Sequence, residues 1–306
     1  MNNKNLYSYP DSEWRFLMKK INLIILVLSS IIFMECGRPG VNISDAGYEP
    51  KIAVEGYLYC GESIKDFRLS RNYAIGVQID SSSLYLTPST NNVTITINGM
   101  PLYFDQTTKT YYNSQITVDY NKTYTLAVSA IVDGQNLQTT STTTTPQKGF
   151  TVLSNNLGTF TYDGNPITVN FITSPGTDFY VFSIVPDTAS TSNFIYNNVL
   201  RKNIDSSDVV KNFNDFKFRD GILDNINSNA GIDYSFTLQL QDTWFYSTYT
   251  IIAYAGDVNF KAYFLTAPNV EEFDGNFHEP IQIFTGAGIG VFASAIRTTV
   301  KFSIVR

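Results

Sequence analysis

Residues 93–98 read VTITIN, and residues 123–130 read TYTLAVSA. In both stretches apolar and polar side chains alternate residue by residue, which places them on opposite faces of a β-strand. The first stretch ends in Asn98-Gly99, a dipeptide typical of the tight turn between two antiparallel strands. We therefore expect this part of the chain to form antiparallel β-sheet.

The same pattern extends over residues 51–146. Residues 51–60 (KIAVEGYLYC) alternate in the same way, and Asp133-Gly134 is a second turn signal before a Thr-rich return strand at residues 136–143. About seven short strands in a segment of this length are typical of an immunoglobulin-like β-sandwich. We predict such a domain for residues 51–146, with Pro146 at its end.

A second β-rich, sandwich-like domain is predicted for residues 147–306. Strand-like alternation recurs in it at residues 168–172, 178–185, 233–241, 247–255 and 298–305. Between residues 186 and 232 the alternation fails, which predicts a partly helical or irregular insert. Short helices could lie at residues 192–200 and 206–214, and residues 244–263 could also include a helix. The fold class expected from the whole chain is all-β.

Composition agrees with a β fold and excludes some partners. Hydrophobic residues make up 43% of the 306 residues, and the 20 Tyr and 22 Phe favour pleated sheet over helix. The formal net charge of -6 gives no electrostatic footprint for nucleic acid, so no nucleic-acid partner is predicted. An acidic chain is also not drawn to anionic membrane surfaces, so attachment to a membrane would need a separate anchor.

Residues 18–36 have the layout of a secretory signal peptide. Met18 is followed by two lysines, residues 21–33 are an apolar run, and Cys36 follows that run after Met34 and Glu35. The run is shorter than the roughly 20 residues of a membrane span, although an uncleaved signal anchor remains the alternative. Residues 1–17 lack these features and are interpreted as a mis-annotated stretch upstream of a true start at Met18.

Cys36 resembles the modified cysteine of bacterial lipoproteins, to which lipid is attached before cleavage leaves it as the first residue. Glu35 departs from this pattern, because a small residue usually precedes the cysteine. We predict that Cys36 is lipidated and attaches the mature chain to a lipid bilayer, with residues 37–50 as a tether. The alternative is an ordinary cysteine within a simple signal.

Cys60 is predicted to have a different role from Cys36. In residues 51–60 it shares its parity with Ile52, Val54 and Leu58, so alternation places it on the buried face of a strand. A thiol there behaves as a small core residue. We expect Cys60 to be reduced and inert.

Residues 286–290 (GAGIG) superficially resemble a nucleotide-binding loop. Such a loop must follow a strand and open a helix, whereas β-like sequence follows here. A close crossing of two backbones explains the glycines better. We predict no cofactor.

Acidic residues supply the other candidate sites. Glu271, Glu272, Asp274 and Glu279 could bind calcium or act as an acid/base pair, although a solvated loop is the plainer interpretation. Residues 220–233 are rich in Asp and Asn but lack the ligand spacing of a calcium-binding loop, so turn propensity explains them better. The one histidine, His278, would have to support a zinc site or a catalytic triad alone. We therefore predict no catalytic residue and no metal site.

Aromatic neighbours are a further possibility for binding. Tyr111-Tyr112 and residues 244–246 (WFY) could stack on sugars or contact a partner. Packing within the sandwich is the alternative for any one of them.

The order of several short motifs resembles a lipoprotein family of Bacteroidota, the family of domain of unknown function 4249. The motifs are residues 49–56 (EPKIAVEG), 67–71 (FRLSR), 121–128 (NKTYTLAV), Pro146, Glu279-Pro280 and residues 286–293 (GAGIGVFA). The resemblance covers most of the mature chain. It implies an outer-membrane lipoprotein with an immunoglobulin-like first half, and it implies no activity.

Two classes of function are compatible with these features. One is a non-enzymatic binding or accessory module on the outer membrane, next to a TonB-dependent transporter, since such lipoproteins are often encoded beside one. A position facing the periplasm is preferred, because no acidic run follows Cys36. The alternative is a glycan- or peptide-active hydrolase with an unrecognised carboxylate site.

Overall fold

The computed structural model describes residues 47–74, 76–80, 83–154, 157–162, 165–196, 206–211, 213–217, 219–227, 229, 231, 233–266, 281 and 283–306. Glu49–Arg306 forms one compact unit. The predicted signal, Cys36 and the predicted tether up to residue 46 lie outside the described residues.

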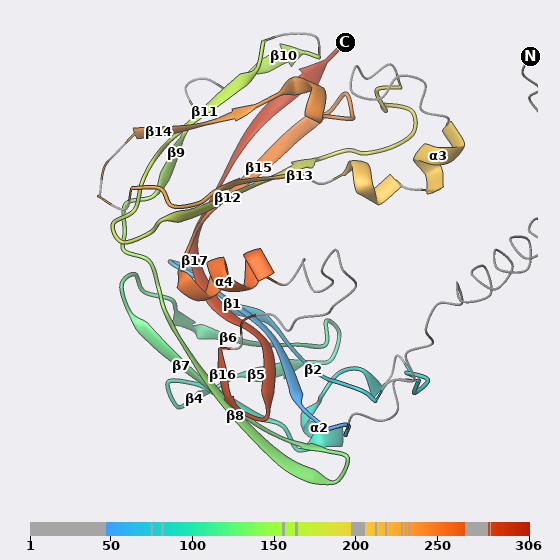
Figure 1. The fold of residues 1–306 in the computed structure, drawn as a ribbon, viewed down its shortest axis with the longest axis vertical. Helices are drawn as coiled ribbons and strands as arrows, with labels where there is room; N and C mark the ends of the chain where they lie inside the picture. The colour runs from blue at the N-terminus through green and yellow to red at the C-terminus, as the bar shows by residue number, and fades with distance from the viewer. Residues whose placement is uncertain are drawn as a thin grey trace, which may run out of the picture. The chain divides into compact units, whose positions relative to one another are not determined.

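A nine-stranded sheet runs through this unit (Figure 1). Its central strand is β17, which neighbours both β1 and β15. In order the strands are β13 (Arg219–Leu223), β12 (Phe179–Pro186), β15 (Thr248–Gly256), β17 (Gly288–Val305), β1 (Ile52–Tyr59), β2 (Ser63–Arg71), β6 (Thr110–Thr117) and β5 (Tyr103–Asp105), while β10 (Thr159–Thr161) also pairs with β17.

Strand β17 joins the two halves of the chain. Its first part pairs with β1 in parallel, from Ile52 opposite Gly288 to Tyr59 opposite Ala295, and its remainder pairs with β15 antiparallel. The sequence predicted a strand only from residue 298. That boundary is too late, because the start of β17 is buried on both faces and shows no apolar/polar alternation.

A five-stranded sheet packs against the first half of the large sheet. It contains β16 (Phe284–Gly286), β8 (Gln135–Thr144), β7 (Thr123–Val132), β3 (Thr94–Ile97) and β4 (Met100–Pro101). The core between the two sheets is mainly aliphatic and includes Leu58, Leu126 and Val128. Asn98 and Gly99 have φ of 51° and 79°, as the predicted turn between β3 and β4 requires. This part is a two-layer β-sandwich, as predicted, and the end of the chain contributes β16 and part of β17 to it.

A three-stranded sheet covers the second half of the large sheet. Its strands are β14 (Asp233–Leu238), β11 (Ile167–Ile172) and β9 (Thr151–Leu153). The core beneath it is rich in aromatic rings, among them Phe171, Tyr180 and Phe182. The prediction of an all-β fold with a second sandwich-like part is therefore confirmed. The boundary after Pro146 stays a prediction, because β17 contributes side chains to both cores.

Short helices occur in the connections. They are α2 (Pro88–Asn91), α3 (Ser206–Lys211), η3 (Phe213–Phe216), η4 (Leu240–Asp242) and α4 (Val258–Thr266). The predicted insert at residues 186–232 contains α3 and η3, and it also contributes strand β13, which the sequence pattern did not indicate. The expected strand at residues 233–241 is shorter than predicted, because η4 follows it. A helix within residues 244–263 is confirmed by α4, whereas residues 192–196 are not helical.

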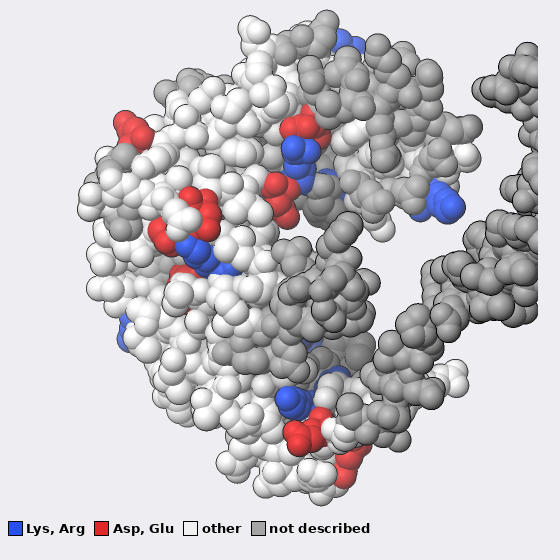
Figure 2. Space-filling view, viewed as in Figure 1, with Lys and Arg blue, Asp and Glu red and all other residues white. Residues whose placement is uncertain are grey.

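Among the described residues, no helix is long and apolar enough to cross a membrane. Most of the face visible in Figure 2 is uncharged, and its acidic and basic side chains lie beside one another in small groups.

Candidate functional site: a tyrosine-lined groove

The large sheet carries a groove on the face that points away from both main cores. Alternation produces this face: in β12, Tyr180 and Phe182 enter the aromatic core, whereas Phe179 and Val181 belong to a third apolar cluster under α4. In β1 the same alternation of side chains places Leu58 in the aliphatic core. Tyr57 and Tyr59 then lie on the groove face.

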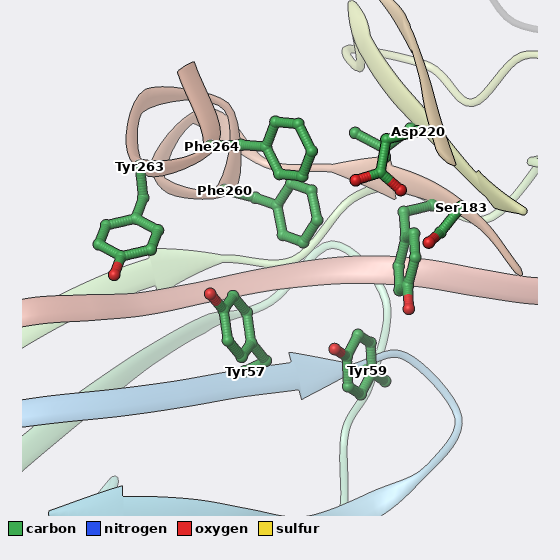
Figure 3. A pocket seen from close by; sticks show the side chains of 9 residues that line it. Tyr57, Tyr59, Ser183, Asp220, Phe260, Tyr263 and Phe264 are labelled. Atoms are coloured by element: carbon green, nitrogen blue, oxygen red, sulfur yellow. The ribbon is translucent and has the colours of Figure 1, made fainter. Parts of the chain in front are cut away.

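The groove is a hollow of about 220 Å³ between the sheet and α4 (Figure 3). Six aromatic side chains contribute most of its lining: Tyr57, Tyr59, Tyr254, Phe260, Tyr263 and Phe264. The rings of Tyr57 and Tyr59 are near parallel, with centroids 6.4 Å apart. The lining comes from β1, β12, β13, β15 and α4. Because β1 is distant in sequence from the other four elements, only the folded chain assembles it.

Small residues of the sheet lie beneath these aromatic rings. Ala293 and Ala295 lie in β17 opposite Tyr57 and Tyr59, and both alanines are fully buried. Gly256 ends β15 under the helix, and a Cβ added there would lie 2.5 Å from the ring of Phe260. A larger residue at position 256 would push the helix away from the sheet.

Asp257 fixes the start of α4 to the sheet. Its Oδ1 accepts hydrogen bonds from the backbone N–H of Phe260 at 2.9 Å and of Ser294 at 3.0 Å, while its Oδ2 accepts one from the Thr143 hydroxyl. A carboxylate at this position satisfies an unpaired amide of the first helical turn. Burial raises the pKa of Asp257, although the hydrogen bonds it accepts oppose that shift.

Asn259 adds a second attachment for the helix. Its Nδ2 donates to the backbone oxygen of Thr142 at 2.7 Å and to that of Phe292 at 3.0 Å. Helix α4 is therefore tied to β8 and to β17, which keeps the wall of the groove in place.

A charged pair borders the groove beside Tyr59. Arg297 donates through Nε and Nη2 to the two carboxylate oxygens of Glu62, at 2.7 and 2.5 Å. The guanidinium carbon of Arg297 lies 4.1 Å from the ring centroid of Tyr59. This distance is within the range of a cation–π contact.

The phenol groups of the groove stay protonated at neutral pH. Burial raises the pKa of Tyr57 far above its usual range and raises that of Tyr59 to about 12. Burial also raises the pKa values of Tyr254 and Tyr263. Each hydroxyl can therefore donate as well as accept a hydrogen bond.

Asp220 supplies the acidic group of the lining. It lies on β13 directly opposite Ser183 of β12, and Ser183 also lines the groove. The Asp220 side chain is exposed, and among the described residues no cation pairs with it. Its neighbour Arg219 pairs instead with Asp242, at 3.0 Å.

Several residues singled out from the sequence lie elsewhere. Cys36, Glu271, Glu272, Asp274, His278 and Glu279 are outside the described residues. Cys60 has a free, buried thiol whose pKa is raised by burial to about 12, as its alternation predicted. It lies one residue beyond the end of β1.

The glycines of residues 286–290 mark a close crossing of backbones, as predicted. A Cβ added to Gly290 would lie 2.1 Å from the backbone oxygen of Val54, and one added to Gly288 would lie 2.1 Å from the Thr139 hydroxyl. Both glycines lie in strand β17 rather than at the start of a helix. The segment is therefore part of the sheet.

The acidic stretch at residues 220–233 does not form a metal site in the described part of the chain. No group of three potential ligands occurs among the described residues. Asp224 instead pairs with Lys261 of α4, at 2.5 Å between Oδ1 and Nζ. No sequence pattern indicated that Asp220, from the same stretch, would line the groove.

The aromatic pairs split between core and surface. Tyr111 and Phe245 are fully buried, so packing is the correct interpretation for both, while Tyr112 is partly exposed. Tyr57 and Tyr59 line the groove, although they were not predicted as binding residues. Their shared parity in residues 51–60 was the available signal.

Comparisons with known proteins add little. No family model matches the chain, and no curated protein matches it. Among solved structures, the titin domains Z1Z2 in complex with telethonin match at 12% identity, over 84% of this chain and 95% of that one, with a TM-score of 0.18. A TM-score this low carries no argument about this protein.

Proposed function

We propose that the protein is a lipid-anchored binding module of the outer membrane, which binds its ligand in the tyrosine-lined groove. The groove is the observation that supports binding. It combines aromatic side chains, which give large contact area, with the hydroxyls of Tyr and Ser and one carboxylate, which orient a ligand. Sites of this kind form where several elements meet around a concave surface.

Rigidity of the groove also supports a binding role. Helix α4 is held by Asp257 and Asn259, and strands β1, β12, β13 and β15 supply the opposite wall. A wall that is ordered before the ligand arrives lowers the entropy cost of binding.

The membrane part of the proposal rests on the sequence. The signal-like residues 18–36 and Cys36 support a lipid anchor, and the family resemblance supports the outer membrane, with the periplasmic face preferred. An anchor confines the module to the membrane surface and so raises its effective concentration near a membrane partner. The proposed partner is a TonB-dependent transporter.

Metabolic labelling tests the anchor. Cells fed radiolabelled palmitate should label the protein, and the variant Cys36→Ala should carry no label. The variant Cys60→Ala is the matched control and should be labelled like the natural chain. Label persisting in Cys36→Ala would rule out the anchor.

Affinity capture tests the partner. Tagged protein extracted in mild detergent should retain a β-barrel transporter in near-stoichiometric amount. Recovery of the protein alone under several mild conditions, together with turnover of a glycan or peptide, would favour the hydrolase.

A further inference from the structure

The groove has the features of a site for a positively charged organic group. Its lining is dominated by aromatic rings, whose faces carry partial negative charge and attract cations. Tyr59 already makes this interaction inside the protein, because the guanidinium of Arg297 lies 4.1 Å from its ring centroid.

The charges around the groove favour a cation over an anion. Arg297 is neutralised by the two-pronged hydrogen bonds to Glu62, and Arg219 is paired with Asp242. Asp220 has no cationic partner among the residues that the structure describes, and its carboxylate brings a negative charge to the lining (Figure 3). The net charge of the chain, -6, adds a weak attraction in the same direction.

The size of the groove limits the ligand. A volume of about 220 Å³ is below the roughly 300–1,000 Å³ of pockets that bury a drug-sized molecule. It suits a compact head group with a few carbon atoms around the charge. An oligosaccharide would have to lie largely outside it.

We propose that the groove binds an alkylammonium group, with the rings of Tyr57, Tyr59 and Tyr254 around the cation and the Asp220 carboxylate opposite its charge. The proposal rests on the proposed binding function and gives its ligand class. Cation–π attraction supplies the affinity, and Asp220 selects for positive charge. A neutral molecule of the same shape lacks both the cation–π attraction and the attraction to the Asp220 carboxylate.

Ligand-observed NMR with two probes of equal shape tests this. Choline is the cation, and 3,3-dimethylbutan-1-ol is its uncharged counterpart. The full chain is used in a polyoxyethylene detergent, which contains neither choline nor sugar. Choline should show saturation transfer from the protein and a measurable Kd, and the alcohol should bind at least about tenfold more weakly. Equal binding of both probes would overturn the proposal.

Variants locate the binding. Asp220→Asn should weaken choline binding by about three- to tenfold, because it removes the opposite charge. Asp233→Asn, an exposed acid on β14, is the matched control and should change nothing. Tyr254→Leu should weaken binding about tenfold, whereas Tyr254→Phe keeps the ring and should stay within about twofold. Circular dichroism and thermal unfolding of each variant check its fold.

The outcomes separate this inference from the proposed function. If choline does not bind, or if its binding is unchanged in Asp220→Asn, the proposal of a cationic ligand is wrong. A neutral saccharide such as maltose could bind instead, with that binding lost in Tyr254→Leu. This result would overturn the proposal of a cationic ligand but leave the groove as a binding site. If neither choline, the alcohol nor maltose binds, both the ligand class and the groove as the binding site are wrong.

Discussion

The two faces of the large sheet use the same strands for different purposes. On the core face, Phe182 and Leu58 are fully buried under the two smaller sheets. On the groove face, Tyr57, Tyr59 and Tyr254 are only partly buried, and α4 covers part of the surface. Because side chains alternate along a strand, the core face can stabilise the fold while the groove face remains available for binding.

This comparison predicts that the crossing of β17 and β1 is the most sensitive point, since both faces depend on it. Gly290 has φ of 103°, and an added Cβ would lie 2.1 Å from the backbone oxygen of Val54. Gly290→Ala should lower the free energy of unfolding by about 4 kcal/mol or more, measured by urea titration.

Gly134→Ala is the control for that prediction. Gly134 has φ of 75° but open space around an added Cβ, so only the backbone conformation is strained, at a cost of about 1 kcal/mol. Equal losses in the two variants would mean that the crossing of β17 and β1 tolerates a side chain.

Truncating one ring on each face tests the comparison directly. Phe182→Ala leaves a cavity in a closed core and should cost about 3–5 kcal/mol in unfolding free energy. Phe264→Ala removes a partly exposed ring from α4 and should cost about 1 kcal/mol, because water can fill the space. A loss of the same size for Phe264→Ala would show that the groove face is as much a core as the other.

The pH dependence of stability tests Asp257, which anchors the groove wall. Burial raises its folded-state pKa above the ordinary 3.8, so the folded protein binds the proton more tightly than the unfolded chain. Its titration therefore favours folding in acid, and that contribution is lost as pH rises from below 3.8 through the raised value.

The variant Asp257→Asn isolates this titration because it carries no ionisable group at position 257. The difference in unfolding free energy, natural chain minus variant, should fall as pH rises over that range, followed by urea titration at several pH values. A difference that grows with pH would contradict the burial of this carboxyl.

Cys60 tests burial on the core side through its chemical reactivity rather than through stability. Its thiol is buried and its pKa is raised to about 12, so a maleimide should modify it roughly a hundredfold or more slowly in native protein than in denaturant. Mass spectrometry of the peptide that contains Cys60 follows the reaction. Rapid native modification would place the residue at the surface.

Local sequence determined the positions of the hairpins and which face of the sheet each strand side chain occupies. The alternation of residues 93–98 and 123–130 and the two turn dipeptides predicted β3, β7 and β8 within one or two residues. The parity of residues 51–60 predicted that Cys60 is buried. These features depend on neighbours within a few residues, so a single chain displays them.

Only the tertiary structure decided the pairing of β1 with β17 and the position of the groove. Residues 52 and 288 meet in parallel register across most of the chain, and no local pattern specifies such a partner. The groove gathers Tyr57 from β1, Asp220 from β13, Tyr254 from β15 and Phe264 from α4. Periodicity sets which way each side chain points, whereas the burial of two separate cores brings the distant strands into one sheet.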